Sequence, residues 1–200
     1  MKRKSRSQHI DKWIFNGIMR KNRCRFMKIF LPLVFCLIVF SVSGQSLPQG
    51  DLKVFSRDNF KISYPSAWRV DTSGTMNSKV FFFSPLEGPE DKFSENLNVM
   101  VQNLAGQPID IQKYKEISEQ QIKVMFSDGK MEESKVVNAN GREEYHLAYE
   151  FSQGIFRLKV LAICFIQNDN AYLATFTSEA SKFDRYRATA EKMLGAFALK

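Results

Sequence analysis

The chain has 200 residues, an apolar share of 44% and a formal net charge of +8, which allow one domain or one domain with an appendage. Residues 1–44 hold ten Lys and Arg residues and one acid, whereas residues 45–200 hold 19 basic and 20 acidic residues. A folded part with a net charge of −1 has no overall positive field to attract phosphate backbones, so we expect no nucleic-acid partner.

The first 44 residues have the pattern of an export leader. After Met27 and Lys28 comes the apolar run IFLPLVFCLIVF, and then the small residues of SVSGQS. This order is typical of a secretory signal peptide, cleaved after Ser43 or after Gly44. A retained membrane anchor is the alternative, but the run is shorter than the ~20 residues that a spanning helix needs.

Met27 also offers a later start, which would leave residues 1–26 untranslated. From the leader we expect a periplasmic or secreted protein, with no stable membrane span after cleavage.

Residues 45–58 form a polar lead-in, with or without one edge strand. Alternation of apolar and polar residues then predicts short strands near 60–64, 68–70, 79–83 and 97–101. Pro65 ends the first of them, because proline has no N–H to donate to a ladder. The charged stretch 84–95 contains prolines and a glycine and is expected to be a loop.

Two segments have helical spacing instead. From Asp110, a good N-cap residue, apolar side chains recur along one helix face to about Phe126. Residues 183–197 carry a second apolar stripe of the same period. Both stripes predict helices that pack on a core.

A meander of strands lies between the two helices. Asn140-Gly141 predicts a two-residue hairpin turn after a strand at 134–138. The segment that ends at Ile166 is apolar on both faces, so we expect it inside the sheet, followed by a last strand at 172–176. The fold class is therefore α+β, with a mainly antiparallel sheet flanked by an inserted helix and a C-terminal helix.

A second tight turn at 153–154 allows a prediction of register. Pairing across this turn sets Phe151 opposite Phe156 and Glu150 opposite Arg157. Apolar residues then meet apolar residues and an acid meets a base, which is the pairing that cross-strand energetics favour.

This order of elements resembles the PsbP-like fold over residues 59–199. The resemblance rests on FKISYPSAWRV, KVFFFSP, NLNVMVQNL, PIDIQKY, REEYHLAYEF and AYLATFTSEASKF. It implies an α/β/α sandwich in residues 59–200 and, because members of this fold mostly bind partners, an accessory protein of the cell envelope rather than an enzyme.

Residues with catalytic or metal-binding chemistry are sparse. Glu144 and His146 fall on one strand face and are candidate metal ligands, but no further ligand completes the set, so we interpret them as a solvated face of mixed charge. Cys164 lies in an apolar strand and is expected to be an inert buried thiol. We predict no catalytic residues and no cofactor, and rank a metal-binding protein or a hydrolase last.

Loop 84–95 is a candidate contact with a protein partner, because loops on a rigid scaffold commonly carry recognition, and the alternative is a plain solvated loop. Within it we single out Glu90, Asp91 and Phe93. The alternative is a carrier of a small apolar ligand or lipid, since the chain has 18 phenylalanines.

Overall fold

The computed structural model describes residues 51–200. Its strands are β1 (Leu52–Arg57), β2 (Phe60–Pro65), β3 (Arg69–Asp71), β4 (Val80–Phe83), β5 (Asn96–Asn103), β6 (Lys130–Ala139), β7 (Arg142–Gln153), β8 (Phe156–Gln167), β9 (Asn170–Glu179) and β10 (Ala198–Leu199). Its helices are α1 (Ile111–Met125) and α2 (Phe183–Gly195). The predicted signal peptide and the alternative start at Met27 lie outside the described residues.

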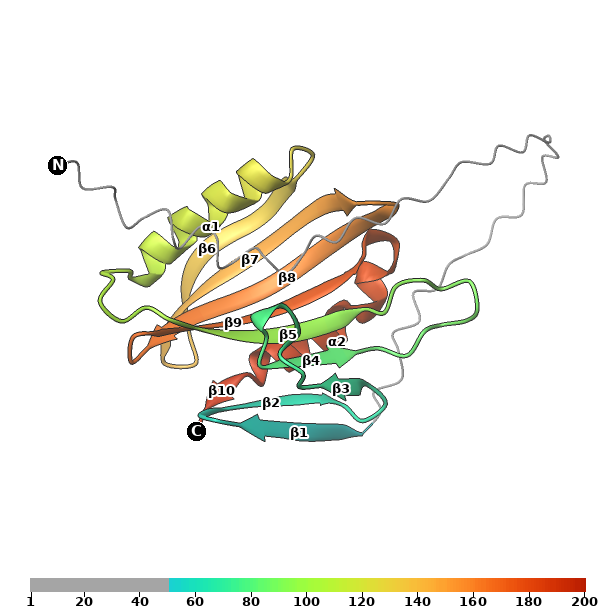
Figure 1. Ribbon diagram of the computed structural model, residues 1–200, viewed down its shortest axis with the longest axis horizontal. Helices are drawn as coiled ribbons and strands as arrows, with labels where there is room; N and C mark the ends of the chain where they lie inside the picture. Colours follow the sequence, from blue (N-terminus) through green and yellow to red (C-terminus); the bar gives the residue numbers. More distant parts are fainter. Residues whose placement is uncertain (1–50) are drawn as a thin grey trace. The chain divides into compact units, whose positions relative to one another are not determined.

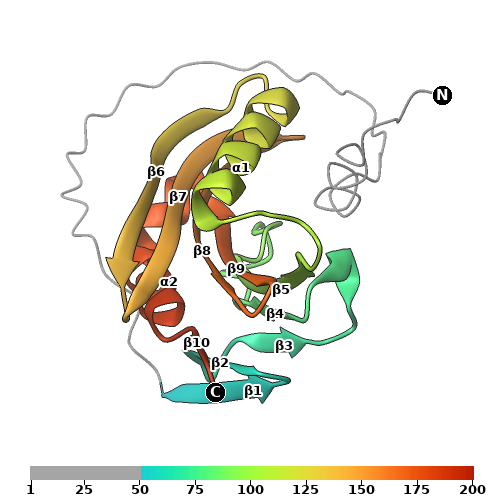
Figure 2. The same cartoon turned by 90° about the vertical axis from the view of Figure 1, so that its left-hand side faces the viewer.

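Seven strands form one antiparallel sheet in the order β3-β4-β5-β9-β8-β7-β6, and a smaller sheet has the order β1-β2-β10. Figures 1 and 2 show α1 on one face of the large sheet and α2 on the other. This arrangement confirms the predicted α+β class with its two flanking helices. The lead-in contains the edge strand that the sequence left open, because β1 pairs with β2 over its whole length.

Each helix closes its own apolar cluster against the sheet. On the α2 side, the rings of Phe82, Phe165 and Phe197 are almost fully buried. On the α1 side, Tyr114 and Tyr145 are buried in a second cluster. Burying a large apolar side chain contributes about 1.5–3 kcal/mol, so these two clusters hold the three layers together.

Strand β8 faces both clusters, as its apolar sequence predicts. Its α1-side residues are Leu158, Val160, Ala162 and Cys164, and its α2-side residues are Leu161, Ile163 and Phe165. The strand also pairs with β7 on one edge and with β9 on the other. It is therefore an internal strand covered on both faces.

The helix boundaries follow local sequence signals. The Asp110 carboxylate accepts a hydrogen bond of 2.8 Å from the backbone N–H of Lys113, which confirms Asp110 as the N-cap of α1. In α2, the predicted stripe is buried through Phe183, Tyr186 and Ala190.

The register predicted for the β7–β8 hairpin is wrong by two residues. Phe151 lies opposite Leu158 rather than opposite the phenylalanine expected. The turn residues are 154–155. Gly154 is at the first turn position with a φ of +63°, a conformation that glycine adopts without the steric cost that a Cβ atom would add. Glu150 and Arg157 still form an ion pair, 2.5 Å between Oε1 and Nε, along a diagonal.

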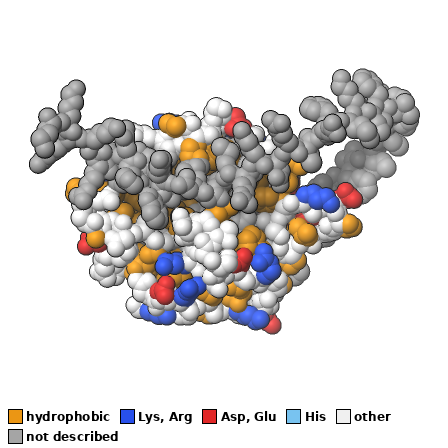
Figure 3. Space-filling view, viewed as in Figure 1, with side chains coloured by type: hydrophobic (Ala, Val, Ile, Leu, Met, Phe, Trp, Pro, Cys, Tyr) orange, Lys and Arg blue, Asp and Glu red, His pale blue; other side chains and the backbone are white. Residues whose placement is uncertain are grey.

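Within the described range, neither helix is long and apolar enough to cross a membrane. Lys and Arg side chains on the face in Figure 3 are interspersed with acidic ones and form no continuous basic surface there.

Candidate functional site

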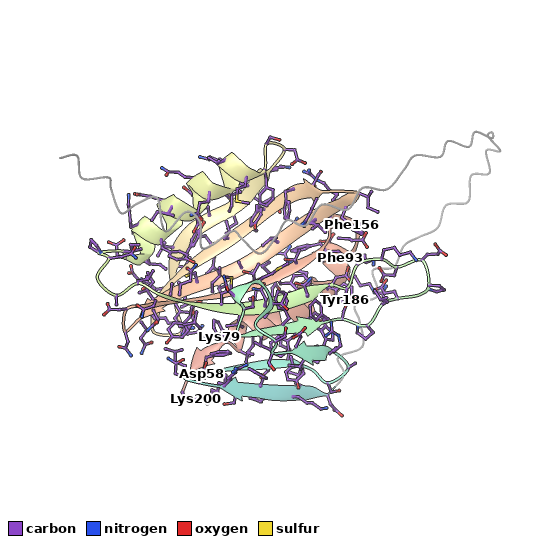
Figure 4. All side chains as sticks on the ribbon, in the orientation of Figure 1. Asp58, Lys79, Phe93, Phe156, Tyr186 and Lys200 are labelled. Carbon is purple, nitrogen blue, oxygen red and sulfur yellow. The ribbon has the colours of Figure 1, made fainter. Side chains whose placement is uncertain are left out.

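A groove of about 500 Å³ lies where loop 84–95 meets the β7–β8 turn and the start of α2. Figure 4 shows this end of the molecule, with Phe93, Phe156 and Tyr186 labelled. The groove is lined by Glu87, Gly88, Pro89, Glu90, Asp91, Lys92, Ile155, Phe156, Glu179 and Lys182. Two of the three predicted contact residues, Glu90 and Asp91, are therefore part of its wall.

Asp91 holds the loop in place instead of standing free for a partner. Its carboxylate accepts hydrogen bonds from Lys182 Nζ at 2.8 Å and from the backbone N–H groups of Glu87 at 2.9 Å and Phe93 at 3.2 Å. The bond from Lys182 and these backbone bonds lower the pKa of Asp91 to about 2. The Asp91 side chain is only 5% exposed, so it anchors the loop, and its role as a contact residue stays a prediction.

Lys182 is the centre of the charged cluster beneath the groove. Its ammonium lies 2.8 Å from Asp91 Oδ1, 2.8 Å from Glu179 Oε2 and 3.7 Å from Glu95 Oε1. Partial burial lowers the pKa of Lys182, but the hydrogen bonds to Asp91 and Glu179 outweigh that effect and leave the pKa raised. The lysine therefore stays charged and joins loop 84–95 to the end of β9.

Glu95 is the least well satisfied member of this cluster. Its side chain is fully buried, and its Oε2 accepts a hydrogen bond of 3.2 Å from Ser84 Oγ. Its Oε1 has no hydrogen-bond partner, with Lys182 the nearest cation. Burial raises the pKa of Glu95, because removing a carboxylate from water penalises its charged form.

Glu87 anchors the other part of the loop to α2. Its Oε1 accepts a hydrogen bond of 2.8 Å from Tyr186 Oη, and its Oε2 lies 2.9 Å from Arg185. Together with Asp91, these contacts make loop 84–95 a fixed structure. A fixed loop loses little conformational entropy when it binds.

The rim of the groove is apolar. Phe93 packs against Phe156 with ring centroids 5.3 Å apart, and Ile155, at the tip of the hairpin, is 89% exposed. Glu90 is exposed beside them. Phe93 thus supports the rim as part of the α1-side cluster, while Ile155 and Glu90 face outward.

Sequence reasoning missed Ile155 and Lys182 as site residues. A large aliphatic residue directly after a turn glycine was the available signal for Ile155. Lys182 had no such signal, since Asp91 is 91 positions away along the chain.

The structure brings Glu144 and His146 together, but not as the solvated pair that the sequence suggested. His146 Nε2 lies 3.2 Å from Glu144 Oε2, while Glu144 Oε1 accepts bonds from Arg142 and Asn140. Glu144 is only 2% exposed, because Arg142 also donates to the carbonyl of Phe197 and ties the C-terminal segment over this face.

A metal ion at this pair would compete with existing hydrogen bonds. Both carboxylate oxygens of Glu144 are already hydrogen-bonded. Across residues 51–200, no group of three or more metal-ligating side chains comes together. Glu144 and His146 form a hydrogen-bonded structural pair, and their weak candidacy as metal ligands stays a prediction.

Cys164 is buried in the α1-side cluster. Burial raises the pKa of its thiol well above the ordinary value, with a smaller opposing effect from a hydrogen bond to Tyr114. The reactive thiolate is thereby disfavoured, as the sequence predicted.

Comparison with known proteins assigns the chain to a family. The PsbP family model matches residues 50–199. The chain belongs to the PsbP family. No curated protein gives a significant match.

Three solved structures share the fold at low identity. Cyanobacterial PsbP (CyanoP) from Synechocystis superimposes with a TM-score of 0.59 and 15% identity, covering 81% of this chain and 99% of that chain. LpqN, involved in cell envelope biogenesis in Mycobacterium tuberculosis, gives 0.54 and 9%, covering 75% and 91%. A protein of unknown function from Pseudomonas aeruginosa gives 0.52 and 11%, covering 73% and 95%.

Proposed function

We propose that this PsbP-family protein is an exported accessory protein of the cell envelope that binds a protein partner through the groove and the Ile155 tip. The observation that carries the proposal is the combination of a fixed loop and an 89% exposed aliphatic side chain next to the Phe93–Phe156 pair. Interfaces draw most of their energy from a few apolar anchors on pre-organised surfaces.

The family and the leader give this proposal its context. LpqN shares the fold and is itself involved in cell envelope biogenesis. The signal-peptide pattern of residues 1–44 supports export of the chain to the envelope. The proposal assigns no reaction to the protein.

Export is tested by the mass of the protein after expression from its full coding sequence in a bacterium with an envelope. A native mass spectrum of a chain starting at Gly44 or Gln45 supports export, and an intact leader contradicts it. Extra mass that leaves on denaturation would support the alternative of an apolar-ligand carrier, which stays a prediction.

Partner binding is tested by a photocrosslinking residue placed at position 155, with position 54 as the control. Val54 is also an exposed aliphatic residue, 64% accessible, but it lies in the small sheet. We expect one defined protein to crosslink at position 155 and not at position 54, and to be lost when Phe156 is changed to Ala. Equal capture at both positions would contradict the proposal.

A further inference from the structure

The small sheet has one face that packs on the core and one that points away from it. Phe60 and Ile62 belong to the α2-side cluster, and Phe55 packs against it. Because side chains alternate along a strand, the residues between them face outward. We call this surface the outer face, and its members are Leu52, Val54, Ser56, Lys61, Ser63 and Pro65. Figures 1 and 2 show β1 and β2 at the lower boundary of the described residues, away from α1.

The outer face exposes two aliphatic side chains. Val54 is 64% exposed and Leu52 is 40% exposed. The register sets Leu52 opposite Pro65 and Val54 opposite Ser63, so no charged side chain lies directly across from either. An exposed aliphatic side chain gains free energy when it enters an apolar phase. The outer face therefore has an apolar centre without a partner in residues 51–200.

The charge of the small sheet differs in sign from that of the rest of the described chain. Residues 51–65 and 198–200 hold four basic and two acidic residues, a net charge of +2. Residues 66–197 hold 15 basic and 18 acidic residues, a net charge of −3. The positive charge that the folded part as a whole lacks is therefore concentrated on this sheet.

These basic side chains have no direct acidic partner. Within residues 51–200, none of the four forms an ion pair; they are Lys53, Arg57, Lys61 and Lys200. Arg57 donates to the carbonyl of Lys79 at 3.3 Å, and Lys200 donates to the carbonyl of Asp58 at 3.0 Å. The Asp58 carboxylate lies 3.9 Å from Lys79 instead (Figure 4). The four cations thus border the apolar centre without being neutralised.

Aliphatic side chains bordered by cations decide the class of partner. A nucleic acid would use the cations but would leave the apolar centre without a contact. Protein interfaces are anchored mainly by Trp, Tyr and Arg side chains in well-packed pockets. The centre of the outer face consists of aliphatic and small side chains instead.

An anionic bilayer has the complementary chemistry. Its headgroups attract Lys and Arg side chains, and the boundary of its acyl chains accepts aliphatic ones. We propose that the outer face binds the surface of an anionic lipid bilayer. Leu52 and Val54 enter the boundary between headgroups and acyl chains, and Lys61 and Lys200 contact the headgroups. This surface is made by other strands than the groove at loop 84–95 and does not depend on the proposed function.

The test is sedimentation with lipid vesicles, using the protein purified after expression from its full coding sequence. One vesicle type contains phosphatidylglycerol and phosphatidylcholine in equal parts, and the other contains phosphatidylcholine alone. We expect the protein to sediment with the anionic vesicles at about 0.05 M salt and to be released at about 0.5 M, because salt screens the attraction. Failure to bind the anionic vesicles, or equal binding to both types, would overturn the proposal.

Two pairs of matched variants locate the contact. Lys61→Gln should weaken binding to the anionic vesicles about fivefold, the value of one cation at such a surface. Val54→Ser should weaken it by a similar factor. Lys123→Gln and Val124→Ser make the same changes at exposed positions of α1 and should leave binding unchanged.

A leader that stays on the chain contributes equally to all four variants, so only the differences between them are assigned to the outer face. Equal losses in the β1–β2 and α1 variants would contradict the assignment. Capture of one defined protein by a photocrosslinking residue at position 54 would assign the outer face to a protein partner and likewise overturn the proposal. The comparison of the two vesicle types with the wild-type chain does not depend on how any variant folds.

Discussion

Two buried glutamates in this protein are stabilised in different ways. Glu144 is 2% exposed, and its carboxylate is bonded to Asn140, Arg142 and His146. Glu95 is fully buried, yet it has one hydrogen bond, from Ser84, and one oxygen without a hydrogen-bond partner.

The difference follows from where the partners come from. Those of Glu144 lie within four positions of it on one hairpin. Those of Glu95 are Ser84, across loop 84–95, and Lys182, which is also shared with Asp91 and Glu179. A carboxylate with several local hydrogen bonds recovers the free energy that its desolvation costs. A carboxylate that depends on a shared, distant cation recovers less of that free energy.

The largest expected effect is that of Lys182→Met, which removes the shared cation and keeps most of the apolar stem. Asp91, Glu95 and Glu179 would then face one another without a positive charge, so we expect the free energy of unfolding to fall by about 3 kcal/mol. Urea denaturation measures it. Lys61→Met, at an exposed lysine on β2, is the control and should change the value by less than about 0.5 kcal/mol.

Arg142→Met should cost less, about 2 kcal/mol, because Glu144 keeps Asn140 and His146. The variant loses the bond to the Phe197 carbonyl and the guanidinium stacked 3.4 Å above the Phe165 ring. Arg187→Met, at an exposed helical ion pair, is the control. A larger loss for Arg142→Met than for Lys182→Met would break the comparison.

Neutralising each glutamate should give a different result. Glu144→Gln removes a well-paired charge and is expected to lower the free energy of unfolding by about 1–2 kcal/mol. Glu95→Gln removes a desolvated charge and should leave stability within about 0.5 kcal/mol or raise it. Thermal unfolding of the two variants side by side provides the measurement. Equal destabilisation would show that Glu95 is as well satisfied as Glu144.

The free energy of unfolding should depend on pH through Asp91 and Glu95 of the Lys182 cluster. The pKa of Asp91 is lowered from 3.8 to about 2 in the folded state, so its contribution is present above pH 4 and is lost as pH falls toward 2. Glu95 acts in the opposite direction, because its raised pKa lets the folded state take up a proton first and gain stability as pH falls toward 4.5. In urea titrations from pH 2 to 5, Asp91→Asn should lose less stability on acidification than the wild type. An unchanged slope would contradict this role of Asp91.

Local signals predicted much of the fold. The Asn140-Gly141 turn has positive φ at both residues, 54° and 75°, as its sequence requires. Asp110 caps α1 through a bond to a residue three positions later. The β7–β8 register was missed, because two candidate turns that differ by one residue share the same glycine.

The sequence predicted that loop 84–95 belongs to the candidate site, but it did not predict which side chains anchor the loop or which other segment completes the rim. Loop 84–95 does form the groove, yet Asp91 faces inward, and Ile155 joins the rim from a hairpin that follows the loop by some sixty residues. Periodicity in one segment carries no information about which distant segment packs beside it.

By itself, the sequence determined the strand and helix segments, the internal position of β8, the family resemblance and the near-neutral charge of residues 45–200, because these depend on short-range pattern and composition. Only the tertiary structure decided that Glu144 and Glu95 are buried and that Lys182 joins three carboxylates. Burial and pairing are set by contacts between residues tens of positions apart, and those contacts exist only once the sheet has closed.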